Sequence, residues 1–189
     1  MAEVALNGES ATALTVATIA LVPQVVDAVG DKVPVVAAGG LFDGRGLAAS
    51  LALGADGVWI GTRFIATPEA RAVNGYKDQL LATGEDGTTI SRAYTGKTCR
   101  VVANDWTRHY DKNPADLQPF PQQAVASMQA GVNHLGFPTG TEVDTSREFY
   151  PAGQGVGSIN DLVPAGELVR RIVAEASAVL ARVGNIRAK

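Results

Sequence analysis

The chain has 189 residues, a formal net charge of −3 and 46% hydrophobic residues, which is typical of a globular protein with a real core and argues against nucleic acid as a partner. The chain has a single cysteine, so it can form no internal disulfide. The cysteine and the two histidines are not spaced as metal ligands. No apolar run is long enough to span a bilayer and the N-terminus carries no basic leader, so we expect a cytoplasmic protein that binds no membrane.

The first 61 residues predict strands alternating with helices. Pro23 is expected in the first turn of a helix that Gly30 ends, and Asp43 is expected to cap a crossover helix. An almost continuous apolar run is typical of a strand buried on both faces. The predicted strands lie at residues 3–6, 33–38 and 57–61, and the predicted helices at residues 21–29 and 44–53.

The remainder of the chain contains no further parallel-strand pattern. Thr67-Pro68-Glu69 is typical of a helix start, with a cap, a proline at the first helical position and an acidic first turn. Prolines at residues 112–122 prevent a regular element there and predict a linker. Residues 136–157 predict a long loop. The other predicted elements are a helix over 67–81, a strand pair at 88–93 and 98–102, a helical turn at 104–110, and helices at 120–132 and 164–183.

Both of the strong strands deliver glycine at their C-terminal ends. Gly39-Gly40 follow the first strand and Gly61-Thr62 follow the second. Glycine allows backbone N–H groups to approach an anion closely, and the carboxyl ends of parallel strands meet at one edge of a sheet. An ordinary turn and a helix-packing glycine would explain either pair alone. Their repetition one βα unit apart favours a phosphate site like the one after the last two strands of a (β/α)8 barrel.

The length of the chain limits how much of such a barrel it can form. A complete (β/α)8 barrel needs about 250 residues. We therefore expect an α/β fold that is the C-terminal part of a TIM-type (β/α)8 barrel, incomplete, with a helical C-terminal region. Residues 1–110 are expected to form the partial barrel with the phosphate-binding turns, and residues 111–189 a helical and loop extension that packs on it. Open sheet edges predict a homodimer.

Several segments together resemble one enzyme family. They are AAGGLFDGRG at 37–46, LGADGVWIGTRF at 53–64, TGKTCR at 95–100, PAGQGVG at 151–157 and PAGELV at 164–169. With these segments the chain resembles the nitronate monooxygenases, once called 2-nitropropane dioxygenases. The resemblance implies a TIM-barrel flavoprotein in which FMN, without a metal, oxidises alkyl nitronates with molecular oxygen.

The resemblance also implies which residues hold the FMN. The first phosphate-binding turn of the family corresponds to Ala38, Gly39 and Gly40 in this chain. Gln154 lies in a motif that is close to the flavin in the family. Its second phosphate-binding turn corresponds to Trp59, Ile60, Gly61 and Thr62. Three charged residues beside these turns are expected to be structural, as a helix cap, a helix-surface cation and an ion-pair partner; they are Asp43, Arg45 and Arg63.

The chain departs from the family pattern at the catalytic base. The family usually carries Glu-Ala-Gly-Gly-His-x-Gly just before Val-Ala-Thr-x-x-Leu-Val-Pro, and that histidine is the base. Residues 16–23 match the second stretch, but residues 7–14 contain no histidine. His109 and His134 lie outside the motif and are expected to be structural. No catalytic residue is predicted, and we expect impaired activity.

Two other functions are compatible with the same turns. A flavin-dependent enoyl-acyl-carrier-protein reductase shares the Gly-Gly and Gly-Thr pairs, and so does the inosine-monophosphate dehydrogenase group, whose reactive cysteine loop is not visible here. A non-catalytic barrel remnant that binds phosphate weakly is the alternative outside enzymes.

Overall fold

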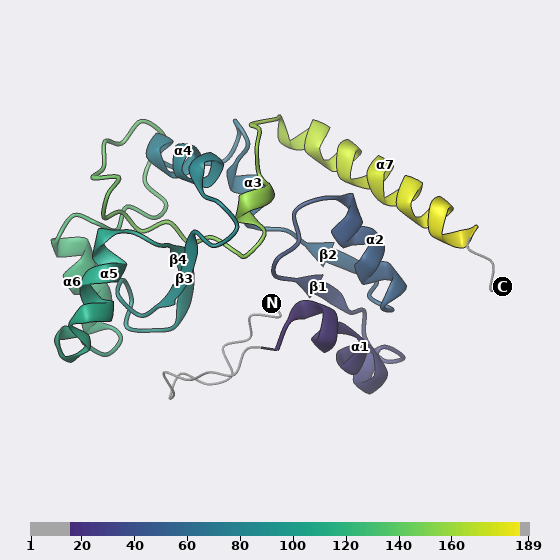
Figure 1. Ribbon diagram of the computed structural model, residues 1–189, viewed down its shortest axis with the longest axis horizontal. Helices are drawn as coiled ribbons and strands as arrows, with labels where there is room; N and C mark the ends of the chain where they lie inside the picture. The colour runs from purple at the N-terminus through teal and green to yellow at the C-terminus, as the bar shows by residue number, and fades with distance from the viewer. Residues whose placement is uncertain (1–15, 186–189) are drawn as a thin grey trace.

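The computed structural model describes residues 16–185, and their elements form two groups (Figure 1). One group packs two short parallel strands with three helices. Its elements are β1 (Val36–Ala38), β2 (Gly57–Trp59), α1 (Thr18–Val29), α2 (Gly44–Ala52) and α7 (Ala165–Gly184). The other group contains an antiparallel hairpin and three helices. Its elements are β3 (Thr88–Ser91), β4 (Cys99–Val102), α4 (Asn74–Ala82), α5 (Asp105–Lys112) and α6 (Gln122–Gln129).

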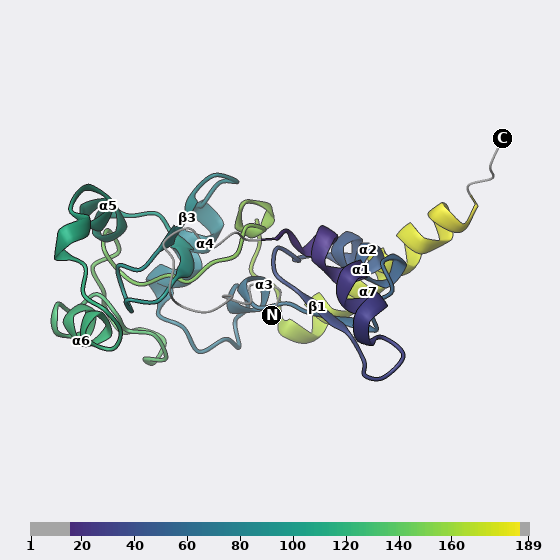
Figure 2. The same cartoon turned by 90° about the horizontal axis from the view of Figure 1, so that it is seen from below.

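Short elements connect the two groups. α3 (Thr62–Ile65) and the 3-10 helix η2 (Val156–Ser158) lie between them, and a second 3-10 helix, η1 (Pro114–Asp116), interrupts the expected linker. Figure 2, turned by 90°, shows the same separation. The expected boundary at residue 110 falls inside α5, and the predicted strand at 3–6 lies outside the described residues. None of the helices within residues 16–185 is long and apolar enough to cross a membrane.

The strands β1 and β2 pair in parallel, as predicted, and the fold is α/β. Val36 lies opposite Gly57 and Ala38 opposite Trp59. Pairing is shorter than predicted because the Val35 N–H donates to the Asp56 carboxylate at 2.7 Å, and the chain turns into α3 soon after β2. The prediction that the first strand is buried on both faces is wrong. Ala37 and Ala38 are buried, but Val36, at the start of β1, is 49% exposed.

α2 packs against α7 at very short range. Asp43 caps α2 as predicted, accepting the N–H groups of Arg45 and Gly46. The next contact is between backbones: a Cβ on Gly44 would lie 2.4 Å from the Ile172 carbonyl oxygen and 2.6 Å from the Ala176 nitrogen. The absence of a side chain at Gly44 therefore allows α7 to approach α2.

Two glycines of α2 provide a matched test of this approach. Gly44→Ala is expected to lower the free energy of unfolding by about 1–3 kcal/mol, because the new methyl group overlaps the backbone of α7. Gly46→Ala is expected to be neutral or to stabilise by up to about 1 kcal/mol, since its closest contact is the movable Leu41 side chain at 3.1 Å. Urea unfolding of the two variants measures the difference. Equal midpoints would contradict the close approach.

Two predicted helices begin at other residues because of distant contacts. α1 begins at Thr18, three residues early, so Pro23 lies inside it rather than in its first turn. Thr18 Oγ1 donates to the Gly39 carbonyl oxygen at 2.9 Å, which ties this helix start to the first glycine turn. The helix predicted over 67–81 begins only at Asn74. The Glu69 carboxylate instead accepts the Ala165 N–H, at the start of α7.

The antiparallel hairpin predicted at 88–102 is confirmed as β3 and β4, with Thr88 opposite Val102. After it, Asn104 caps α5 through a reciprocal capping box with Thr107. The buried Tyr94 hydroxyl donates to the Glu148 carbonyl oxygen at 2.9 Å, and burial raises its pKa. These bonds join the hairpin, α5 and the long loop at 136–157 into one unit.

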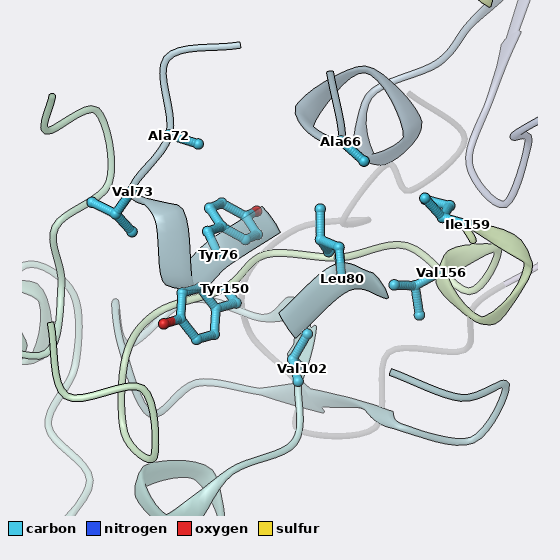
Figure 3. Packing of buried hydrophobic residues seen from close by; sticks show 10 residues of the cluster. Ala66, Ala72, Val73, Tyr76, Leu80, Val102, Tyr150, Val156 and Ile159 are labelled. Carbon is cyan, nitrogen blue, oxygen red and sulfur yellow. The ribbon is translucent and has the colours of Figure 1, made fainter. Parts of the chain in front are cut away.

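A buried cluster packs the end of that loop against α4. Figure 3 shows the rings of Tyr76 and Tyr150 side by side, with Leu80 of α4 and Val156 of η2 in the same cluster. The centroids of the two tyrosine rings lie 5.0 Å apart. The Tyr76 hydroxyl donates to the Pro151 carbonyl oxygen, and burial raises its pKa. The segment that follows Pro151 is therefore fixed in position.

Candidate flavin-phosphate site

A cavity of about 310 Å³ opens at the C-terminal ends of β1 and β2. The two turns after the strands form one wall. The start of β4, residues 151–153 and Gly155 also line the cavity. Six of the eight residues predicted to bind the cofactor line this cavity: Ala38, Gly39, Gly40, Trp59, Gly61 and Thr62.

The first turn has a backbone that requires glycine. Gly39 and Gly40 have φ angles of 101° and 71°, in the region that L side chains rarely adopt. A Cβ on Gly40 would meet no atom within 4 Å, so the space beside this residue is open. The turn can therefore present its backbone to a ligand without interference from a side chain.

The two turns meet at Gly153. The Gly153 N–H donates to Thr62 Oγ1 at 3.0 Å. A Cβ on Gly153 would lie 3.6 Å from Thr62 Oγ1 and 3.8 Å from the Gly40 nitrogen. One hydroxyl and one backbone amide, from two different turns, thus lie around a single point. We call Gly40, Gly61, Thr62 and Gly153 the glycine cradle.

The last two predicted residues lie elsewhere. Gln154 lines an adjoining cavity of about 330 Å³, which shares Gly39 and Gly40 with the first and is bounded by α1 and α2. Ile60 lines neither cavity, although both of its neighbours in sequence line the first one. Trp59 is 73% exposed, so its ring stands at the open side of the site.

Sequence reasoning gave no individual role to the other residues that line the cavity, among them Cys99, Arg100, Ala152 and Gly153. All four belong to segments that carry the family resemblance. Their place in these segments was the one indication in the sequence that they belong to the site. The hairpin brings them close to the turns, and the sequence alone does not reveal that contact.

The three charged residues expected to be structural form a helix cap and ion pairs. Arg45 is exposed and pairs with Asp43 at 2.6 Å. Arg63 is only 4% exposed and pairs with Asp161 at 2.5 Å. Burial lowers the pKa of the Arg63 guanidinium, while hydrogen bonding from Arg171, and then the charge of Arg63, lower the pKa of Asp161.

Neither histidine lines either cavity. His134 Nδ1 and the buried Glu148 carboxylate lie 2.7 Å apart in the second group, and His109 is exposed on α5. Within residues 16–185 no three His, Cys, Asp or Glu side chains are arranged to hold a metal ion.

Comparison with known proteins identifies the family. The sequence model of the nitronate monooxygenases matches residues 6–175. The chain belongs to the nitronate monooxygenase family. The Rv1533 protein of Mycobacterium tuberculosis is 39% identical over 85% of this chain and 43% of its own length. A Staphylococcus aureus protein that carries the family name is 40% identical over 64% of this chain and 34% of its own length. The chain therefore spans less than half of each of these relatives.

Solved structures of similar proteins share this fold. FabK from Thermotoga maritima has a TM-score of 0.75 and 30% identity, covering 90% of this chain and 52% of its own. Nitroalkane oxidase from Streptomyces ansochromogenes has a TM-score of 0.72 and 31% identity, covering 89% of this chain and 46% of its own. The enoyl reductase domain of MlnA from Bacillus amyloliquefaciens, at 16% identity, shows the fold alone.

Proposed function

We propose that this nitronate monooxygenase family chain provides the phosphate end of an FMN site, in a flavoenzyme that oxidises alkyl nitronates with O2. The observation that carries the proposal is the glycine cradle, which brings together two turns at the ends of paired parallel strands. A bound flavin would supply the two-electron oxidation of the substrate and the reaction with oxygen.

The residues present fit a phosphate group. The open spaces beside Gly40 and Gly61 leave both backbones accessible, and no carboxylate belongs to the described lining of this cavity. Thr62 Oγ1 accepts the Gly153 N–H, so its own proton can be donated to a phosphate oxygen. Backbone amides and a hydroxyl are the donors that proteins commonly use for phosphate.

The proposed reaction requires a base as well as a cofactor. Removing a proton from a carbon next to a nitro group requires a side chain of suitable pKa within hydrogen-bond reach. Residues 7–14 contain no histidine where the family usually has one, and they lie outside the described residues. We therefore propose that this chain binds FMN through its phosphate but is impaired in nitronate oxidation.

Flavin binding tests the phosphate site directly. Flavin fluorescence titrations of the chain are expected to give a lower Kd for FMN than for riboflavin, which lacks the phosphate. Gly61→Ala is expected to raise the Kd of FMN about tenfold or more, since a methyl group then stands between the backbone and the phosphate. The Kd of riboflavin should not change.

Gly57→Ala is the matched control. Gly57 also has open space around it, but it lies at the other end of β2 and lines neither cavity. This variant should bind FMN like the unsubstituted chain. Equal affinity of the unsubstituted chain for FMN and riboflavin, or equal losses in the two variants, would refute the phosphate site.

A further inference from the structure

The hydroxyl of Thr18 bonds to a turn twenty residues away rather than to its own helix. Threonine at a helix start often caps the free N–H groups of that helix, but α1 has no side-chain cap. Thr18 Oγ1 instead donates to the Gly39 carbonyl oxygen at 2.9 Å and to the Ala38 carbonyl oxygen at 3.2 Å. A hydroxyl has one proton, so the two acceptors share it, and the shorter bond is the one to Gly39.

The bond to Gly39 fixes one side of the peptide unit that joins Gly39 to Gly40. This unit is trans. A trans peptide unit is planar, so its carbonyl oxygen and its N–H point in opposite directions. Because Thr18 holds the Gly39 oxygen toward α1, the Gly40 N–H must point away from α1.

The Gly40 N–H lies on the side of the glycine cradle. The Gly40 nitrogen is 3.8 Å from the point where a Cβ on Gly153 would lie, and that point is 3.6 Å from Thr62 Oγ1. Thr18 lines the adjoining cavity but not the cavity of the cradle, so its hydroxyl approaches the turn from the other side. Among residues 16–185 no group accepts the Gly40 N–H, which leaves it available to a ligand.

The opposite orientation of this peptide unit would disfavour an anion. Neither Gly39 nor Gly40 has a Cβ that would resist rotation of the unit between them, so sterics alone do not select one orientation. After such a rotation, a carbonyl oxygen with partial negative charge would face the cradle in place of an N–H donor. One hydrogen bond shifts an equilibrium by about two- to tenfold, which is enough to favour one of two orientations that are otherwise similar in energy.

We propose that Thr18 is a positioning residue for the flavin phosphate: its hydroxyl selects the orientation in which the Gly40 N–H points into the glycine cradle. The inference rests on the proposed function and deepens it, because it names the side chain that prepares the first turn for an anion. Thr18 acts through the backbone of the turn. Its loss should therefore weaken the binding of FMN and leave riboflavin, which has no phosphate, unaffected.

The test compares threonine variants by the ratio of the riboflavin Kd to the FMN Kd. Thr18→Val keeps the shape but loses the hydroxyl, and is expected to reduce this ratio about three- to tenfold by raising the FMN Kd. Thr18→Ser keeps a hydroxyl and should retain most of the ratio. Thr141→Val is the matched control, since Thr141 Oγ1 donates to the Pro138 carbonyl oxygen at 2.8 Å and the residue lines neither cavity. This control should leave the ratio unchanged.

A second measurement follows the donor itself. In ¹H–¹⁵N NMR spectra the Gly40 amide proton is expected to move downfield when FMN binds, since a hydrogen bond to a charged phosphate is a strong one. Riboflavin should leave this signal in place, and Thr18→Val should reduce the movement that FMN causes. If Thr18 only held α1 to β1, Thr18→Val would lower the urea midpoint but would change neither the ratio nor the NMR response.

The outcomes separate the two proposals. If the unsubstituted chain does not prefer FMN, the phosphate site fails and the role of Thr18 fails with it. If Gly61→Ala reduces the ratio and Thr18→Val does not, or if Thr141→Val reduces it equally, the phosphate site stands and the role of Thr18 is overturned. If Thr18→Val does not fold by circular dichroism, the Gly40 amide of the unsubstituted chain decides. A downfield movement with FMN but not with riboflavin supports the proposal, and no movement overturns it.

Discussion

Oxygen uptake by this chain with propyl-2-nitronate and added FMN is expected to match the uptake caused by free FMN alone. The expectation rests on the base, since general base catalysis contributes about 10² to 10⁴ in rate. Residues 7–14 contain no histidine, and His109 and His134 line neither cavity. Trp59, which lines the cavity, is 73% exposed, so the described residues leave part of the site open to water, which weakens electrostatic effects.

The measurement uses an oxygen electrode, with the chain at a concentration that binds most of the FMN. Turnover of about 1 s⁻¹ or more, an ordinary enzyme rate, would show that another residue serves as the base. A parallel assay with NAD(P)H and an enoyl thioester tests the enoyl reductase alternative. Activity in that assay, without nitronate oxidation, would show that the chain acts as an enoyl reductase.

The turns of the site were predictable from the sequence because their geometry is local. Glycine allows a backbone with positive φ, and Gly39 and Gly40 have it, whereas Gly61 of the second turn has a φ of −95°. Two such strands joined by one short helix must be parallel neighbours, and β1 and β2 are. The binding of FMN at these turns stays a prediction until it is measured.

The other wall of the cavity was not predictable in the same way. Arg100 approaches the turns through the pairing of β3 with β4 and through the bond from Ala152, which lies 52 residues later in the chain. Hydrophobic periodicity contains no information about such a contact. Glu69 shows the same limit: its position after a proline is typical of a helix start, but its carboxylate caps α7, 96 residues away.

Arg63 provides the second large effect that we expect. Arg63→Met should lower the free energy of unfolding by about 2–3 kcal/mol, because each buried acceptor that loses its donor costs roughly 1–3 kcal/mol. The guanidinium is buried, and its Nη1 donates to the carbonyl oxygens of Ala66 and Asp161 at 3.1 Å each, while Nη2 donates to the Asp161 carboxylate. Methionine fills a similar volume but leaves these oxygens without their donor.

Arg171 is the matched control, because it pairs with the same carboxylate from the surface. Its Nη1 lies 2.6 Å from Asp161 Oδ2, with both side chains close to half exposed. Arg171→Met should therefore cost about 1 kcal/mol or less, as exposed ion pairs do. Urea unfolding of the two variants, with similar m-values, measures the comparison. An Arg171→Met loss as large as that of Arg63→Met would show that the charge of Asp161, and not the buried bonds of Arg63, dominates. If burial dominates, Arg63 holds the end of α3 to the segment before α7, and the second phosphate turn depends on it for its position.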